Sequence, residues 1–287
     1  MTSATERVRE RVRESYGAAV TGGESCCGDS CCGDVTPKGV AAKVAGYSAA
    51  ELAALPESAV VNSFGCGNPL AFSGVEPGQV VLDLGSGAGI DLLLAAERVG
   101  PEGRVIGVDM TDEMIDKARQ AASSAGLANI DVRKGLIEDL PVDSGSVDWV
   151  ISNCVINLSP EKDRVFAEIA RVLKPGGRIS ISDIVIERMP WWIRRSGRLH
   201  SACVAGAISE ADYVAGLERA GLAQVEVTER LVYEANQLAS LAESEVATAN
   251  LPSWLRRPAT RLLAAATRRF AGRVWSAKFT GLRGALI

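Results

Sequence analysis

Residues 79–91, with the sequence QVVLDLGSGAGID, join an apolar run to a loop of closely spaced glycines. The apolar run is typical of a buried strand, and the residues that follow it, Asp91 to Arg98, are typical of a helix. Glycine permits a tight turn and lets a ligand approach the backbone closely. A glycine loop between a strand and a helix therefore predicts a binding site for a nucleotide-like cofactor.

The spacing of these glycines separates one class of cofactor from another. Gly85, Gly87 and Gly89 follow the pattern G-x-G-x-G, and Ile90 stands where the dinucleotide fingerprint needs its third glycine. The acidic residue Asp83 lies inside the segment of strand and turn. The pattern argues against a nicotinamide or flavin cofactor.

Residues that follow the next two strands point to an adenosine group. Asp109 ends the second predicted strand, where a carboxylate can accept both hydrogens of a ribose diol. The segment GLIEDLP, residues 135–141, follows the third strand at the edge where open α/β sheets hold ligands. At this position it could surround an adenine ring. The alternative is that Asp83 or Asp109 only accepts hydrogen bonds from a turn.

Strands and helices alternate across residues 76–188 in the order of parallel βαβ units. This zone predicts an α/β cofactor domain, with a mostly parallel sheet and helices on both of its faces. The expected strands are residues 79–84, 104–109, 129–134, 147–152 and 178–184, and the expected helices are Asp91–Arg98, Asp112–Ala125 and Glu161–Leu173.

Two further zones flank the cofactor domain. Residues 1–75 are expected to form an N-terminal helix, begun by a capping box of Ser3 and Glu6, and a cysteine-rich segment. Residues 189–287 are expected to form a lid insertion and a C-terminal α+β region. The other elements expected in these zones are a short helix at Ala49–Leu55, a helix at Glu210–Ala220, a strand at residues 224–230 and a basic helix at residues 254–275.

The composition is that of a globular protein without a nucleic-acid partner. Of the 287 residues, 47% are apolar and 23% are charged, and the formal net charge is −4. No run approaches the roughly 18 apolar residues of a membrane span, and the first residues are too charged for a signal peptide. We therefore expect a cytoplasmic monomer that does not associate with membranes. Eight basic residues and no acid follow Glu245, and this tail is interpreted as a solvated face rather than a membrane-surface helix.

Cysteine is the most informative residue type in the composition. Seven cysteines, an odd number, do not suggest a framework of structural disulfides in an intracellular protein. Four fall in CCGDSCCGD, residues 26–34, and the others are Cys66, Cys154 and Cys203. With one histidine, His200, the chain lacks the mixed ligands of most zinc sites. The cysteines therefore indicate thiol chemistry or the binding of a soft ion.

Four features in this order resemble the class I S-adenosylmethionine methyltransferases: the D-L-G-x-G-x-G loop, the acid that ends the second strand, GLIEDLP, and LKPGG before the fifth strand. The resemblance implies their Rossmann-like fold and S-adenosylmethionine as the cofactor. The cofactor contacts that it implies are Asp83, Gly85, Ser86, Gly87, Gly89, Asp109, Met110, Ile137, Glu138 and Asn153.

Three further segments resemble the arsenite S-adenosylmethionine methyltransferases: GCGNPLAF at residues 65–72, SNCVINLSPEK at residues 152–162, and CVAGA at residues 203–207. This resemblance implies that Cys66, Cys154 and Cys203 bind arsenic(III) as thiolates. It also implies that Cys31 and Cys32, or the other N-terminal pair, supply a thiol for binding or redox turnover. Arsenite and methylarsenite thiol conjugates are then the substrates, glutathione or thioredoxin is the reductant, and detoxification is the role.

The chemistry of arsenic agrees with this assignment, although two alternatives stay open. Trivalent arsenic is thiophilic, and three thiolates leave its lone pair free to act as the nucleophile, so that no general base is needed. One alternative is a methyltransferase of a small organic acceptor such as a quinone, in which the cysteines are incidental. The other is a non-catalytic protein that sequesters or senses soft ions.

Overall fold

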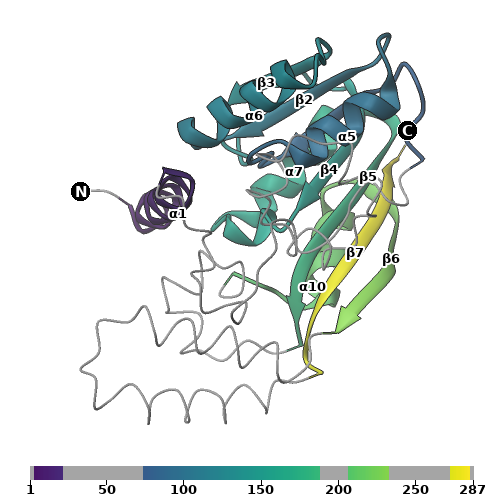
Figure 1. Cartoon of the computed structure of the whole chain (residues 1–287). Coiled ribbons are helices and arrows are strands. Elements are labelled where there is room, and N and C mark those ends of the chain that lie inside the picture. Colours follow the sequence, from purple (N-terminus) through teal and green to yellow (C-terminus); the bar gives the residue numbers. More distant parts are fainter. Residues whose placement is uncertain (1–2, 22–73, 188–205, 233–271, 285–287) are drawn as a thin grey trace, which may run out of the picture.

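A sheet of seven strands forms the centre of the computed structural model, which describes residues 3–21, 74–187, 206–232 and 272–284 (Figure 1). The strands are β1 (Val80–Leu84), β2 (Arg104–Asp109), β3 (Ile130–Lys134), β4 (Val147–Asn153), β5 (Leu173–Ile186), β6 (Leu222–Val232) and β7 (Val274–Arg283). They lie in the order β3-β2-β1-β4-β5-β7-β6. The strands β1 to β5 are parallel, whereas β7 is antiparallel to both of its neighbours.

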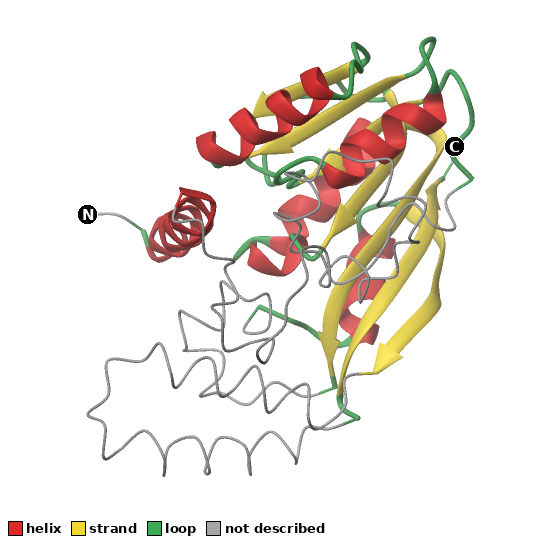
Figure 2. Cartoon of the chain, viewed as in Figure 1, coloured by secondary structure: helices red, strands yellow, loops and turns green. Residues whose placement is uncertain are grey.

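Helices cover both faces of this sheet (Figure 2). They are α5 (Ile90–Val99), α6 (Asp112–Ser124), α7 (Lys162–Val172) and α10 (Glu210–Arg219), and a short 3-10 helix, η1, covers Ile156–Leu158. Val81 belongs to the core shared with α5 and α6, and Leu82 belongs to the core shared with α7 and α10. Because successive strand residues point to opposite faces, burial on both sides explains the apolar run of β1.

The first helix, α1 (Ala4–Thr21), packs against α6. Its first turn contains the predicted capping box, in which Ser3 N donates to Glu6 Oε2 at 2.6 Å and Glu6 N donates to Ser3 Oγ at 3.0 Å. Val12 is buried on this helix. The prediction of an N-terminal helix is confirmed.

The alternation predicted for residues 76–188 is also confirmed. The strands β1 to β5 and the helices α5, α6 and α7 occupy the expected segments. β5 begins earlier than expected, at Leu173, and its pairing with β4 is irregular between Val147 and Trp149. The helix α10 and the strand β6 correspond to the elements predicted after residue 206.

The predicted basic helix at residues 254–275 is wrong at its end, because Val274 and Trp275 begin the strand β7. No strand was predicted there. β7 lies between β5 and β6 and buries Ser276 and Lys278, so it lacks the continuous apolar run that identifies a buried strand. Residues 254–271 and the short helix predicted at Ala49–Leu55 lie outside the described residues.

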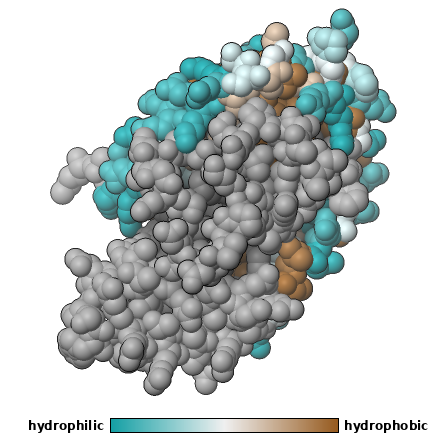
Figure 3. All heavy atoms as spheres, viewed as in Figure 1, coloured by the Kyte–Doolittle hydropathy of each residue, from teal (hydrophilic) through white to brown (hydrophobic). Residues whose placement is uncertain are grey.

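Hydrophilic residues make up much of the described surface on the face shown in Figure 3. Leu231 and Val232 are the large hydrophobic residues that are exposed within the described ranges. In the same ranges, no helix combines the length and the apolar character needed to cross a membrane.

Candidate active site

A pocket opens at the carboxyl ends of β1, β2 and β4, the edge where open α/β sheets bind ligands. The space between its walls, including space that is open to solvent, is about 1010 Å³. The ten residues predicted to contact the cofactor all line it: Asp83, Gly85, Ser86, Gly87, Gly89, Asp109, Met110, Ile137, Glu138 and Asn153. The structure therefore brings these residues together, and their contacts with a cofactor stay a prediction.

The glycine loop meets two different requirements. Gly85 has a φ of 62°, and a Cβ there would lie 2.4 Å from Cγ1 of Val155, so packing requires glycine. Gly87 has a φ of 51°, and a Cβ there would meet no protein atom within 4 Å. Ser86 contributes a buried hydroxyl that has no hydrogen-bond partner among the described residues. The loop thus offers open space and an unpaired polar atom to a ligand.

Asp109 holds the glycine loop in place. Its Oδ2 accepts a hydrogen bond from Gly87 N at 3.0 Å, and its Oδ1 accepts one from Thr111 N at 2.8 Å. The turn-binding role that was the alternative for Asp109 is therefore present. A carboxylate has about four acceptor sites, and the side chain of Thr111 and the backbone of Met110 also hydrogen-bond to this one. Burial raises the pKa of Asp109, and the backbone hydrogen bonds oppose that shift.

Two further carboxylates, Asp83 and Asp91, are buried in the wall of this pocket. Burial raises the pKa of Asp83 well above its usual range, and the negative charges of Asp91 and Asp109 add to the shift. Asn153 Nδ2 donates to Asp91 Oδ2 at 3.3 Å. Carboxylates that repel each other in a buried wall favour a positively charged ligand. Asp91 was missed as a site residue, although its position directly after the glycine loop was a usable signal.

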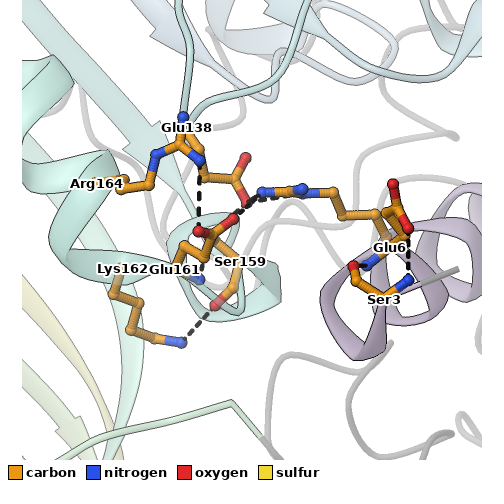
Figure 4. Close-up of polar contacts among 8 residues, drawn as sticks. Ser3, Glu6, Glu138, Ser159, Glu161, Lys162 and Arg164 are labelled. Carbon is orange, nitrogen blue, oxygen red and sulfur yellow. Dashed lines mark hydrogen bonds and ion pairs between the residues drawn. The ribbon is translucent and has the colours of Figure 1, made fainter.

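A cluster of ion pairs fastens α1 to the pocket, around Glu138, Ser159 and Glu161 (Figure 4). Arg9 Nη2 and Nε lie 3.0 and 3.2 Å from Glu138 Oε1, and Arg9 Nη2 also pairs with Glu161. Ser159 Oγ donates to the same oxygen of Glu138 at 2.7 Å. Through α1, the residues Arg9, Val12 and Tyr16 join the lining of the pocket.

Glu138 was predicted to contact the cofactor, but its carboxylate already accepts hydrogen bonds from Arg9 and Ser159. Sequence reasoning missed Arg9, which is 129 residues away from Glu138 along the chain. No local motif connects residues at such a separation.

Cys154 directly follows β4 and lines the same pocket. Its φ of 59° is a left-handed conformation that is uncommon for residues other than glycine, and the residue is 4% exposed. Its N–H donates to the carbonyl oxygen of Ser182 at 2.8 Å. Cys154 is disulfide-bonded, and its partner is not among the described residues.

The other thiols predicted for the site are not placed by the structure. Cys66, Cys203, Cys31 and Cys32 lie outside the described residues. In the part of the chain that is described, no three His, Cys, Asp or Glu side chains form a group that could hold a metal ion. The convergence of Cys66 and Cys203 on Cys154 therefore stays a prediction.

The sheet, the glycine loop and the pocket together define the fold of the class I S-adenosylmethionine methyltransferases. A family model described as a methyltransferase domain matches residues 75–237, which is more than half of the chain. The chain belongs to this methyltransferase domain family.

Similar proteins include several arsenite methyltransferases. That of Halobacterium salinarum is 46% identical over 231 residues, which cover 77% of this chain and 59% of the relative. That of Aquipseudomonas alcaligenes is 42% identical over 158 residues, which cover 52% of this chain and 45% of the relative. This chain thus spans about half the length of these two curated relatives.

One solved structure matches a larger share of this chain, and of its own chain, than these two relatives do. The crystal structure of an arsenic(III) S-adenosylmethionine methyltransferase from Chlamydomonas reinhardtii matches with a TM-score of 0.61 and 30% identity. The match covers 88% of this chain and 75% of that chain.

Proposed function

We propose that this protein transfers the methyl group of S-adenosylmethionine to trivalent arsenic, in arsenite and methylarsenite presented as thiol conjugates. The observation that carries the proposal is Cys154, a buried residue in a left-handed conformation at the wall of the pocket. Such a conformation costs on the order of 1 to 3 kcal/mol, which favours a functional reason for it. Similarity to arsenite methyltransferases supports this choice of substrate.

The residues of the pocket fit S-adenosylmethionine. Gly87 leaves open space beside the backbone, and Ser86 Oγ has no partner within the described structure. Asp83 and Asp91 suit a cation, and Asp109 lines the pocket at the end of β2, where the proposed ribose would lie. When bound, S-adenosylmethionine supplies a methyl group on a positively charged sulfonium.

Cys66, Cys154 and Cys203 are the thiols that we propose to bind arsenic as thiolates. Soft sulfur ligands suit this soft ion, and they leave its lone pair available as the nucleophile. The protein then has to position arsenic rather than to supply a general base. Because Cys154 is disulfide-bonded, this disulfide must be reduced before the thiol can bind arsenic.

A thiol reductant, glutathione or thioredoxin, completes the proposal. Methyl transfer formally oxidises arsenic by two electrons, and two thiols return these electrons when they form a disulfide. Cys31 and Cys32, or the pair Cys26 and Cys27, would relay electrons from the reductant by thiol exchange. We propose a monomeric enzyme for arsenic detoxification in the cytoplasm, where thiols are kept reduced.

The test is an assay of the purified protein with S-adenosylmethionine, arsenite and glutathione. We expect S-adenosylhomocysteine and methylated arsenic to form, and their formation to depend on arsenite. The Cys154→Ser variant should bind S-adenosylmethionine normally and form neither product, because a hydroxyl is a poor ligand for a soft ion. Tight arsenic binding without turnover, or turnover only with a quinone-type acceptor, contradicts the proposal.

A further inference from the structure

A buried polar cluster joins the loop that follows β4 to the strand β5. Asn157 in η1 and Asp183 in β5 are both 0% exposed. Asn157 N donates to Asp183 Oδ2 at 3.1 Å, and Asn157 Nδ2 donates to Asp183 Oδ1 at 2.8 Å. The same Nδ2 donates to the carbonyl oxygen of Ile184 at 2.6 Å. Asn157 is therefore bound both to the carboxylate and to the backbone of β5.

The segment that carries Cys154 is tied to β5 at both of its ends. Cys154 N donates to the carbonyl oxygen of Ser182 at 2.8 Å, and three residues later Asn157 binds Asp183. A short segment that is fixed at both ends can adopt few backbone conformations. The conformation adopted here includes the positive φ of Cys154. The bonds to Asp183 thus oppose the relaxation of Cys154 to an ordinary conformation.

Asp183 also accepts hydrogen bonds from Ile184 N at 2.9 Å and from the hydroxyl of Tyr213 at 3.2 Å. Burial raises the pKa of this carboxyl to about 7, while these hydrogen bonds and the charge of Lys162 oppose the shift. A buried carboxyl that is surrounded by donors is unfavourable unless all of its bonds are made, so it specifies the positions of its partners.

We propose that Asp183, acting through Asn157, is a positioning residue that holds Cys154 in place for arsenic. This inference rests on the proposed function. Asp183 does not line the pocket, so its effect on the reaction passes through the loop of Cys154.

The test compares Asn157→Ala and Asp183→Asn with a matched control, Tyr213→Phe. The control removes a hydrogen bond to Asp183 but none to the loop, and it keeps the ring that stacks on Phe279. We expect the two loop variants to raise KM for arsenite at least tenfold while the Kd of S-adenosylmethionine changes less than threefold. Tyr213→Phe should change neither value.

The possible outcomes separate this inference from the proposed function. Wild-type protein without arsenite-dependent turnover contradicts the proposed function itself. Given active wild-type protein, an unchanged KM for arsenite in either loop variant overturns the positioning role. Parallel losses of cofactor and arsenite binding in both variants also overturn it, because the cluster then only stabilises the fold.

Discussion

At the residue scale, Gly87 and Gly126 form a matched pair. Their φ values are 51° and 68°, and at each position a Cβ would meet no protein atom within 4 Å. Of the two, Gly87 lines the pocket. Alanine at either position therefore introduces similar backbone strain, of about 1 to 2 kcal/mol, but of the two only Gly87→Ala places a methyl group in the pocket.

We expect Gly87→Ala to weaken S-adenosylmethionine binding at least tenfold and Gly126→Ala to leave it unchanged. Calorimetric titration measures the affinities, and thermal unfolding should show comparable losses of stability. Equal affinities in the two variants would mean that the cofactor does not approach Gly87.

Asp183 makes the free energy of unfolding depend on pH. Its pKa of about 7 in the folded protein lies above its ordinary value of 3.8 because the carboxyl is buried. The stabilisation that it provides is therefore complete below about pH 4 and is lost as the pH rises through about 7. We expect wild-type stability, relative to Asp183→Asn, to fall by roughly 1.4 kcal/mol per pH unit across this interval. Urea unfolding of both proteins at several pH values measures the difference, and a difference that does not vary with pH contradicts the prediction.

The residues of the pocket illustrate what sequence patterns reveal. Glycines and acids at the ends of consecutive strands meet at one edge of a parallel sheet, so Gly87, Asp109 and Glu138 were predictable as neighbours. The pairing of Arg9 with Glu138 was not, because it depends on how α1 packs against elements that are distant in sequence.

At the element scale, the attachment of α1 gives the next prediction. Arg9 bonds to Glu138 and Glu161, whereas Arg13 pairs with Glu10 on the same helix. Arg9→Ala removes the ion pairs between α1 and the pocket and leaves the buried Glu138 without its cationic partner. Arg13→Ala changes the net charge by the same amount and leaves the ion pairs of Arg9 in place.

We expect Arg9→Ala to speed dissociation of S-adenosylmethionine at least threefold and to increase amide hydrogen exchange in α1. Arg13→Ala should match the wild type in both measurements. Wild-type exchange rates throughout α1 in Arg9→Ala would show that other contacts hold this helix.

The strands show the same limit of sequence patterns. β1 could be predicted because it is buried on both faces and therefore consists mostly of apolar residues. β7 is also an interior strand of the described sheet, between β5 and β6, yet Ser276 and Lys278 interrupt its apolar pattern. The negative charges that act on Lys278 belong to Glu229 and Asp91, which are distant in sequence, so no local pattern identified the strand.

At the scale of the whole molecule, the proposed reaction connects the described pocket with thiols elsewhere in the chain. Cys154 belongs both to the pocket, which it lines, and to the group of cysteines, because it is disulfide-bonded. The sequence motifs around Cys66 and Cys203 predict their roles, but spacing along the chain does not determine whether three sulfurs meet at one point. The functions of the thiols are therefore best separated by kinetics.

The last prediction separates binding thiols from redox thiols. Serine replaces Cys26, Cys27, Cys31 and Cys32 together, which removes the proposed relay and keeps the three proposed arsenic ligands. Without the relay, oxidised enzyme is not reset by thiol exchange, so multi-turnover methylation of arsenite should be lost. Methylarsenite already has one arsenic–carbon bond and needs fewer thiolates, so at least one transfer to it should persist when glutathione is abundant. Single-turnover and steady-state assays with arsenite and with methylarsenite measure this difference between the two substrates. Full wild-type turnover on arsenite would show that the CCGDSCCGD segment is dispensable for the reaction.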